Sequence, residues 1–172
     1  MAELKARKNI RLKNYNYSNP NAYFITVCVK DKHAMLGKIV GARIARPCEY
    51  EQKIILSKEG LIVDAAIRTI SPVYKTVTVE KYVIMPNHIH MILNLHDCQG
   101  RAMRAPTISA IINQMKGYVT KQIGYSIWQK LFHDHIIRNK TEYHKIWQYI
   151  NENPQKWQDD IYFVAEGSHH DL

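Results

Sequence analysis

The sequence predicts an α+β fold built on one antiparallel sheet. Strand-like runs of apolar residues occupy 23–29, 77–85, 88–95 and 128–137. Apolar residues at helical spacing follow Ser57 and again follow Thr107, and a third helical segment ends at Pro154. The order is therefore strand, helix, strand, strand, helix, strand, with one helix appended. This order is typical of a ferredoxin-like sandwich, which carries helices on one face and places its first and third strands at the sheet centre.

The composition predicts one basic domain over residues 1–172. Hydrophobic residues make up 46% of the chain and charged residues 23%, without repeats or an interdomain linker. The net charge of +9 favours a polyanionic partner such as nucleic acid, with an anionic membrane surface as the alternative. No apolar run approaches the roughly 18 residues of a membrane span, and the start of the chain lacks an apolar signal core. We therefore expect a cytoplasmic protein without membrane contacts.

The first third of the chain combines a basic arm, a central strand and a surface excursion. Residues 1–20 form the arm, in which Lys8, Arg11 and Lys13 precede several tyrosines. Such an arm binds phosphates and stacks on bases, or it is simply solvated, and both interpretations stay open. The strand at 23–29 is apolar on both faces, which places it inside the sheet. The excursion over 35–56 carries weak strand signals at 38–40 and 53–56.

Capping residues give the expected limits of the three helices. Ser57 caps the first helix, which Pro72 stops and whose buried stripe is Ile62, Ala66 and Ile70. The second helix runs from Thr107 to Gly124 and leaves Lys116 outside. Thr141 is expected to cap the last helix, which continues to about Asn153. The cysteines Cys28, Cys48 and Cys98 form no C-x-x-C pair, so we expect reduced thiols.

The most informative stretch is His88-Ile89-His90, which follows the turn residues Pro86 and Asn87. Alternate side chains of a strand share one face, so the two imidazoles point the same way while Ile89 points into the core. Paired imidazoles are suited to binding a metal ion. The alternative is that both are solvated polar residues on a half-exposed strand.

The appended helix carries a second pair of polar residues beside its apolar stripe. Tyr149 and Asn153 lie one helical turn apart and therefore stack on one face. Together they offer a nucleophile and a third metal ligand. The competing interpretation makes Tyr149 a residue at the rim of the apolar stripe and Asn153 a helix-end residue before Pro154.

These motifs, in their order along the chain, give a resemblance to a known family. The sequence resembles the HUH single-tyrosine transposases, and most closely the REP-associated tyrosine transposases, relatives of the transposases of small bacterial insertion sequences. The resemblance covers nearly the whole chain. It is carried by Asn14-Tyr15, Ala22-Tyr23-Phe24, the segment from Met85 to His90, Trp128-Gln129, the segment from His133 to Arg138, and the segment from Tyr149 to Pro154.

The resemblance implies a metal-dependent DNA strand-transfer enzyme in a bacterial cytoplasm. His88 and His90 match the paired histidines that hold Mg²⁺ or Mn²⁺, Tyr149 matches the nucleophile, and Asn153 matches the helix residue completing the metal site, where insertion-sequence members often have Gln. The implied substrate is single-stranded DNA with a short hairpin, such as a repetitive extragenic palindrome. Cleavage would leave a 5′-phosphotyrosine and a free 3′-OH. The resemblance leaves open whether the protein is a monomer or a homodimer.

Further residues are candidates for DNA contacts or for alternative chemistry. Basic side chains beyond the arm that are candidates for phosphate contacts are Arg101, Arg104, Lys116, Arg138 and Lys140. Tyr118 is the second candidate nucleophile, whereas His133 and His135 favour a structural or DNA-contact role over a metal role. Two other functions stay open: a nucleic-acid-binding protein of the same fold without catalysis, and a metal-dependent nuclease that uses water.

Overall fold

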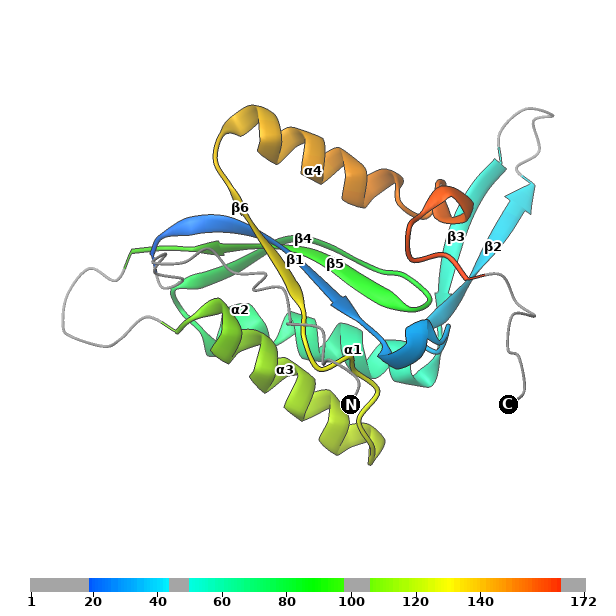
Figure 1. Cartoon of the computed structure of the whole chain (residues 1–172), viewed down its shortest axis with the longest axis horizontal. Helices are drawn as coiled ribbons and strands as arrows, with labels where there is room; N and C mark the ends of the chain where they lie inside the picture. Colours follow the sequence, from blue (N-terminus) through cyan, green and yellow to red (C-terminus); the bar gives the residue numbers. More distant parts are fainter. Residues whose placement is uncertain (1–18, 44–49, 98–105, 165–172) are drawn as a thin grey trace, which may run out of the picture.

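A four-stranded antiparallel sheet forms the centre of the molecule (Figure 1). The structure is a computed structural model that describes residues 19–43, 50–97 and 106–164. The strands follow the order β4-β5-β1-β6 and comprise β1 (Asn21–Cys28), β4 (Val77–Ile84), β5 (His88–Leu95) and β6 (His133–Ile137). This confirms the predicted ferredoxin-like sheet, with the first and third predicted strands, β1 and β5, at its centre.

Helices cover both faces of the sheet. One face is covered by α1 (Lys58–Arg68), the short α2 (Ile70–Val73) and α3 (Ile108–Ile123), and the appended α4 (Lys140–Glu152) lies on the opposite face (Figure 1). Two short 3₁₀ turns, η1 (Lys30–Lys32) and η2 (Trp157–Asp159), lie outside these layers. No helix among the described residues is long and apolar enough to cross a membrane.

The two faces of β5 have different environments because side chains alternate along a strand. Ile89 and Met91 are fully buried in the main core with α1 and α3. His88, His90 and Ile92 point to the other side, where Ile92 packs in a smaller cluster with Ile150 of α4. The paired histidines therefore lie on the face covered by the appended helix.

The segment that connects β1 to α1 along the chain forms a separate two-stranded hairpin, which projects away from the main sheet (Figure 1). Its strands, β2 (Gly37–Arg43) and β3 (Tyr50–Leu56), extend the weak strand signals expected at 38–40 and 53–56. The base of the hairpin is fixed to the turn before the histidines, because the amide of Leu36 donates to the carbonyl of Pro86 at 2.9 Å.

The caps of two helices are as predicted. The Ser57 side chain accepts from the amide of Gly60, and that of Thr107 accepts from Ala110, while Gly124 ends α3 with a φ of 93°. The buried stripe of α1 differs from the prediction, because Val63 and Ile67 are fully buried whereas Ile62 is only partly buried.

Three predicted limits were wrong. Thr141 does not cap α4; the side chain of Asn139 does, accepting from the amide of Glu142, whose carboxylate accepts from the amide of Arg138. Pro72 does not stop α1, which ends at Arg68. It lies in the first turn of α2, where backbone N–H groups have no intrahelical acceptor, so a residue without an N–H is tolerated there. The strand expected over 128–137 pairs with β1 only from His133, and Trp128 makes an isolated bridge with Val29.

Candidate metal and tyrosine site

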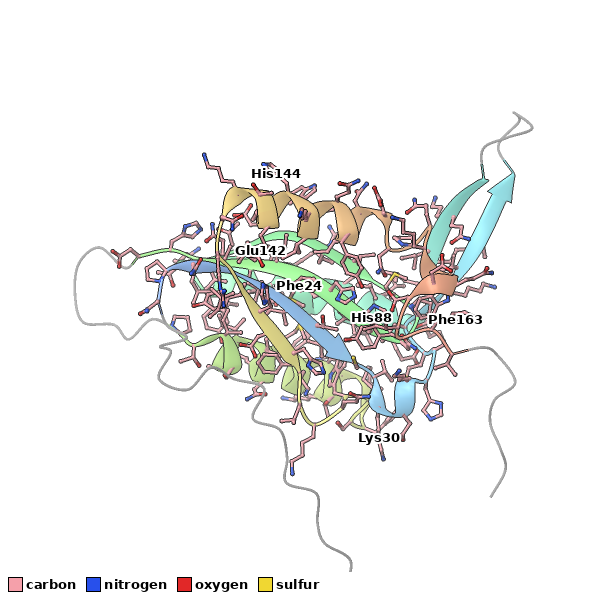
Figure 2. All side chains as sticks on the ribbon, turned by 45° about the horizontal axis from the view of Figure 1, so that its top comes forward. Phe24, Lys30, His88, Glu142, His144 and Phe163 are labelled. Carbon is pink, nitrogen blue, oxygen red and sulfur yellow. The ribbon has the colours of Figure 1, made fainter. Side chains whose placement is uncertain are left out.

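His88 and His90 lie buried at the start of β5, with 0% and 1% of their surfaces exposed. Their ring centroids are 4.4 Å apart, and they oppose Cys28 and Thr26 of β1 in the sheet register. Figure 2 shows His88 at the end of the sheet beside the C-terminal turn, where the rings of Trp157 and Tyr162 lie 5.9 and 4.5 Å from the His88 ring. The sheet therefore places both imidazoles together, as the alternation predicts.

Asn87 fixes which nitrogen of His88 carries the proton. Its amide nitrogen donates to the carbonyls of Lys32 and Tyr162, at 3.1 and 2.7 Å, which orients its carbonyl oxygen toward His88. That oxygen lies 2.8 Å from Nδ1 and only accepts hydrogen bonds, so Nδ1 is protonated and donates to it. The Nε2 of His88 therefore keeps its lone pair, and this buried nitrogen has no hydrogen-bond partner.

His90 connects the strand to the appended helix. Its Nδ1 lies 2.9 Å from the hydroxyl of Thr26, and its Nε2 lies 3.2 Å from the hydroxyl of Tyr149. Phe24 of β1 stacks on the imidazole, with the ring centroids 5.1 Å apart. The sequence-predicted nucleophile and one of the predicted metal ligands are thus in contact within one chain.

Apolar packing positions Tyr149 and Asn153. Ile150, 1% exposed, packs with Ile92 of β5 and Ile137 of β6, and three further residues of α4, Tyr143, Ile146 and Trp147, pack on the same cluster. Tyr149 and Asn153 then lie at the C-terminal end of α4, where the hydroxyl of Tyr149 contacts His90. A cleft of about 380 Å³ opens beside Tyr149 and is also lined by Asn153, Lys156 and Asp160.

Asn153 is buried and has one amide atom without a partner. Only 2% of its surface is exposed, and its Nδ2 donates to the carboxylate of Asp160 at 2.8 Å. Its Oδ1 is buried without a hydrogen-bond partner. An orphaned, buried carbonyl oxygen is a chemically suitable donor for a hard divalent ion.

Asp160 is the residue of this site that the sequence analysis missed. It directly follows η2, and its carboxylate, with the imidazole nitrogens of His88 and His90, forms a group whose ligand atoms all lie within 4.8 Å of one another. The residues after Pro154 show no regular spacing of apolar side chains, so the sequence gives no signal that brings this carboxylate to β5.

Burial keeps the site histidines neutral and the tyrosine protonated. Burial, followed by the charge of Lys32, lowers the pKa of His88 to about 3. Burial and the neighbouring His88 hold the pKa of His90 well below its usual value. The pKa of Tyr149 rises to about 12, mainly through burial and then through the negative charge of Asp160. Neutral imidazoles are the form that binds metal ions.

The other candidate residues are scattered around this site or lie outside the described chain. Arg138 and Lys140 are exposed beside the start of α4. Lys116 is partly buried, and its ammonium donates to the carbonyls of Gln129 and Lys130. Among the remaining basic candidates, the residues outside the described ranges are Lys8, Arg11, Lys13, Arg101 and Arg104.

The alternative nucleophile and ligands lie apart from the histidine pair. Tyr118 is on α3, which covers the opposite face of the sheet, and is 46% exposed. His135 pairs with Glu142 at 2.7 Å, and within the described ranges neither His133 nor His135 belongs to a group of potential metal ligands. Cys28 is a buried free thiol, whereas Cys48 and Cys98 lie outside the described ranges.

The fold is similar to that of a solved tyrosine transposase. The structure is similar to that of a REP-associated tyrosine transposase bound to a REP hairpin, with a TM-score of 0.61 and 22% identity over 86% of this chain and 74% of the other. A candidate transposase from Deinococcus radiodurans has a TM-score of 0.46 and 14% identity, over 83% and 95% of the two chains. The resemblance seen in the sequence is confirmed at the level of the fold.

A sequence relative places the chain in a family. An uncharacterized protein of Haemophilus influenzae is 31% identical over 183 residues, which cover 95% of this chain and 96% of the relative. The chain belongs to the same family as this protein. No protein-family model matches the sequence.

Proposed function

We propose that this protein is a DNA transposase of the HUH single-tyrosine type, which cleaves and rejoins single-stranded DNA. The observation that carries the proposal is the contact between the Tyr149 hydroxyl and Nε2 of His90, 3.2 Å apart, beside the unpartnered Nε2 of His88. A phenol nucleophile placed against paired imidazoles on a central strand is the constellation that the resemblance implies.

The donor set fits a hard divalent cation such as Mg²⁺ or Mn²⁺. His88 and His90 would hold it through their ring nitrogens, and the orphaned Oδ1 of Asn153 supports the role predicted for that residue. When bound, such an ion neutralises charge on the nonbridging oxygens of a phosphodiester. The neutral state of both histidines means that no proton must leave them before binding at neutral pH.

Tyr149 would perform the covalent step. Its phenol loses a proton, the phenolate oxygen bonds to the scissile phosphorus, and the bond from phosphorus to the 3′-oxygen breaks. The leaving oxygen takes up a proton and becomes a free 3′-OH, while the 5′-phosphate stays on the tyrosine. A second 3′-OH reverses the step and joins strands without ATP. With a pKa raised to about 12, the tyrosine needs a nearby positive charge to ionise.

The proposed substrate is single-stranded DNA that carries a hairpin. The net charge of +9 supports a polyanionic partner. The REP-associated transposase of the same fold is bound to a REP hairpin, which supports this substrate class for the present chain. Arg138 and Lys140, exposed near the start of α4, and Lys156, which lines the cleft beside Tyr149, are candidates for phosphate contacts.

The test is formation of a covalent protein–DNA adduct. The full chain is incubated with labelled hairpin DNA taken from beside its own gene, with Mn²⁺ or Mg²⁺, and resolved on a denaturing gel. We expect a labelled band at the size of the protein that disappears with chelator and in Tyr149→Phe. Tyr118→Phe, the matched control, should retain it because Tyr118 lies on the opposite face of the sheet.

Two outcomes would identify the other candidate functions. Cleavage that persists in Tyr149→Phe without any adduct would indicate a nuclease that uses water. Binding of the hairpins without cleavage by the wild-type protein would indicate a nucleic-acid-binding protein of the same fold.

A further inference from the structure

We infer that the carboxylate of Asp160 is the anionic ligand of the divalent cation at this site, held in position by Asn87 and Asn153. The inference rests on the proposed function, because it assumes that the paired histidines bind such a cation. It extends the donor set from a neutral group of two imidazoles and an amide to one that carries a negative charge.

Three electron-pair donors converge from distant parts of the chain. The ligand atoms of His88, His90 and Asp160 all lie within 4.8 Å of one another, although Asp160 is contributed by the turn that follows η2. The Nε2 of His88 is buried and unpartnered. Among the described residues, no lysine or arginine forms an ion pair with Asp160. A cation among these donors would offset the repulsion between their lone pairs.

The carboxylate is held by donors on both oxygens. Oδ1 accepts from the amide of Tyr162 at 2.7 Å, and Oδ2 accepts from Nδ2 of Asn153 at 2.8 Å. The hydroxyl of Tyr149 lies 3.5 Å from the same Oδ2. A carboxylate oxygen has more than one lone pair, so these contacts leave capacity for a metal ion. Asn153 acts as a positioning residue for Asp160 in addition to offering its own Oδ1.

Asn87 connects the carboxylate to the histidine strand. The carbonyl of Tyr162, two residues after Asp160, accepts from Nδ2 of Asn87 at 2.7 Å. The other end of the same amide accepts from His88. One buried side chain thus sets both the tautomer of His88 and the position of the turn that carries Asp160. Such outer contacts commonly determine metal affinity because they orient the ligands.

This donor set has a chemical consequence. Two imidazoles, one carboxylate and the Oδ1 of Asn153 would be fewer ligands than such an ion usually takes, so the ion could also accept oxygen ligands such as those of a phosphodiester. The carboxylate also reduces the net charge of the occupied site by one. Removing that charge while keeping the shape of the side chain should therefore weaken the binding of a divalent cation directly.

The experiment measures Mn²⁺ binding to the full chain without DNA, from the electron paramagnetic resonance signal of free Mn²⁺. We expect Asp160→Asn to weaken binding by at least about tenfold, as loss of a ligand or its support does. The matched control is Asp159→Asn, which removes the same charge from an exposed neighbour in the same turn and should bind Mn²⁺ within about twofold of wild type.

The outcomes separate this inference from the proposed function. Wild-type affinity in Asp160→Asn, with binding lost in His88→Ala, would overturn the role of Asp160 and leave the proposed function intact. Mn²⁺ binding by neither wild type nor variant would overturn both. Tyr149→Phe should bind Mn²⁺ normally even though it forms no adduct with DNA.

A folding control keeps the test decisive. If Asp160→Asn lowers the thermal midpoint of the metal-free protein, Asp160→Glu is measured beside it, because glutamate keeps the charge. Tighter binding of Mn²⁺ by Asp160→Glu than by Asp160→Asn supports the inference, and equal binding by the two variants overturns it.

Discussion

His88 and His90 are unusual residues because they are buried, adjacent and neutral. Burial removes the solvation of an imidazolium, so both pKa values fall below the ordinary value of 6.5. The proton on His88 resides on Nδ1 because Asn87 accepts it there. The environment of His88 therefore keeps a lone pair on its Nε2 at neutral pH. The same environment lowers the free energy of unfolding in acid, where His88 is protonated in the unfolded chain but not in the folded chain.

The first prediction concerns that cost in the metal-free protein. Below pH 6.5 His88 is protonated in the unfolded chain, whereas in the folded chain it stays neutral down to about pH 3. The free energy of unfolding therefore falls as the pH is lowered through this window. Between pH 7.5 and 4.5, His88 alone should lower the free energy of unfolding by about 3 kcal/mol. Urea denaturation with chelator, followed by circular dichroism, measures the loss at the two pH values.

The loss of unfolding free energy on acidification should be about 3 kcal/mol smaller in His88→Gln than in wild type. His144→Gln, which changes an exposed histidine of α4, should show the same acid sensitivity as wild type. Equal acid sensitivity in His88→Gln and wild type would show that the pKa of His88 is not lowered in the folded state.

At the scale of elements, the site depends on where the base of the hairpin meets the sheet and α1. Leu36 joins these elements, since its amide donates to Pro86 and its carbonyl accepts from Ser57. The first turn of α1 packs so closely here that a Cβ on Gly60 would lie 1.9 Å from the carbonyl oxygen of Leu36. Glycine is required at this position by space and not by backbone conformation.

The second prediction compares two glycines in helices. Gly60→Ala should destabilise the protein by about 3 kcal/mol, because the backbone of Leu36 must shift to admit a methyl group. Gly117→Ala should stabilise it by about 0.5 to 1 kcal/mol, since the position is exposed in α3 with open space around its Cβ. Chemical denaturation of both variants measures the difference. Equal stability of the two would mean that α1 does not approach Leu36 so closely.

At the scale of the molecule, one chain brings all the site residues together. The histidines come from β5, Tyr149 and Asn153 from the end of α4, and Asp160 from the turn after η2. The hydroxyl of Tyr149 contacts His90 of its own chain. This arrangement favours a tyrosine that serves the histidines of the same subunit, whatever the oligomeric state.

The third prediction tests that arrangement by mixing inactive variants. A mixture of Tyr149→Phe and His90→Ala should form no covalent adduct with hairpin DNA, because neither chain has both groups. The measurement is the adduct band of the mixture relative to wild type at equal total protein. Recovery of up to about a quarter of the wild-type band, the fraction expected if subunits exchange freely and one tyrosine serves the partner, would contradict it.

Local signals in the sequence determined much of the scaffold. Thr107 and Gly124 bounded α3 because caps act on their own helix ends, and alternation placed His88 and His90 on one face of β5 because strand periodicity is local. The same reasoning failed at the start of α4, where Asn139 and not Thr141 is the cap, because both residue types cap well and the short segment between β6 and α4 offers no periodic pattern to choose between them.

What the sequence determined by itself is the order of the elements, the histidine pair on a central strand and the spacing of Tyr149 and Asn153 on the last helix. Only the tertiary structure decided that Asp160 joins them and that Asn87 sets the proton of His88. The contacts of Asp160 and Tyr162 link the strand and the turn before it to a non-periodic turn 70 to 75 residues later in the chain. Periodicity reports the face that a residue occupies, whereas such long-range hydrogen bonds depend on how the faces are packed together.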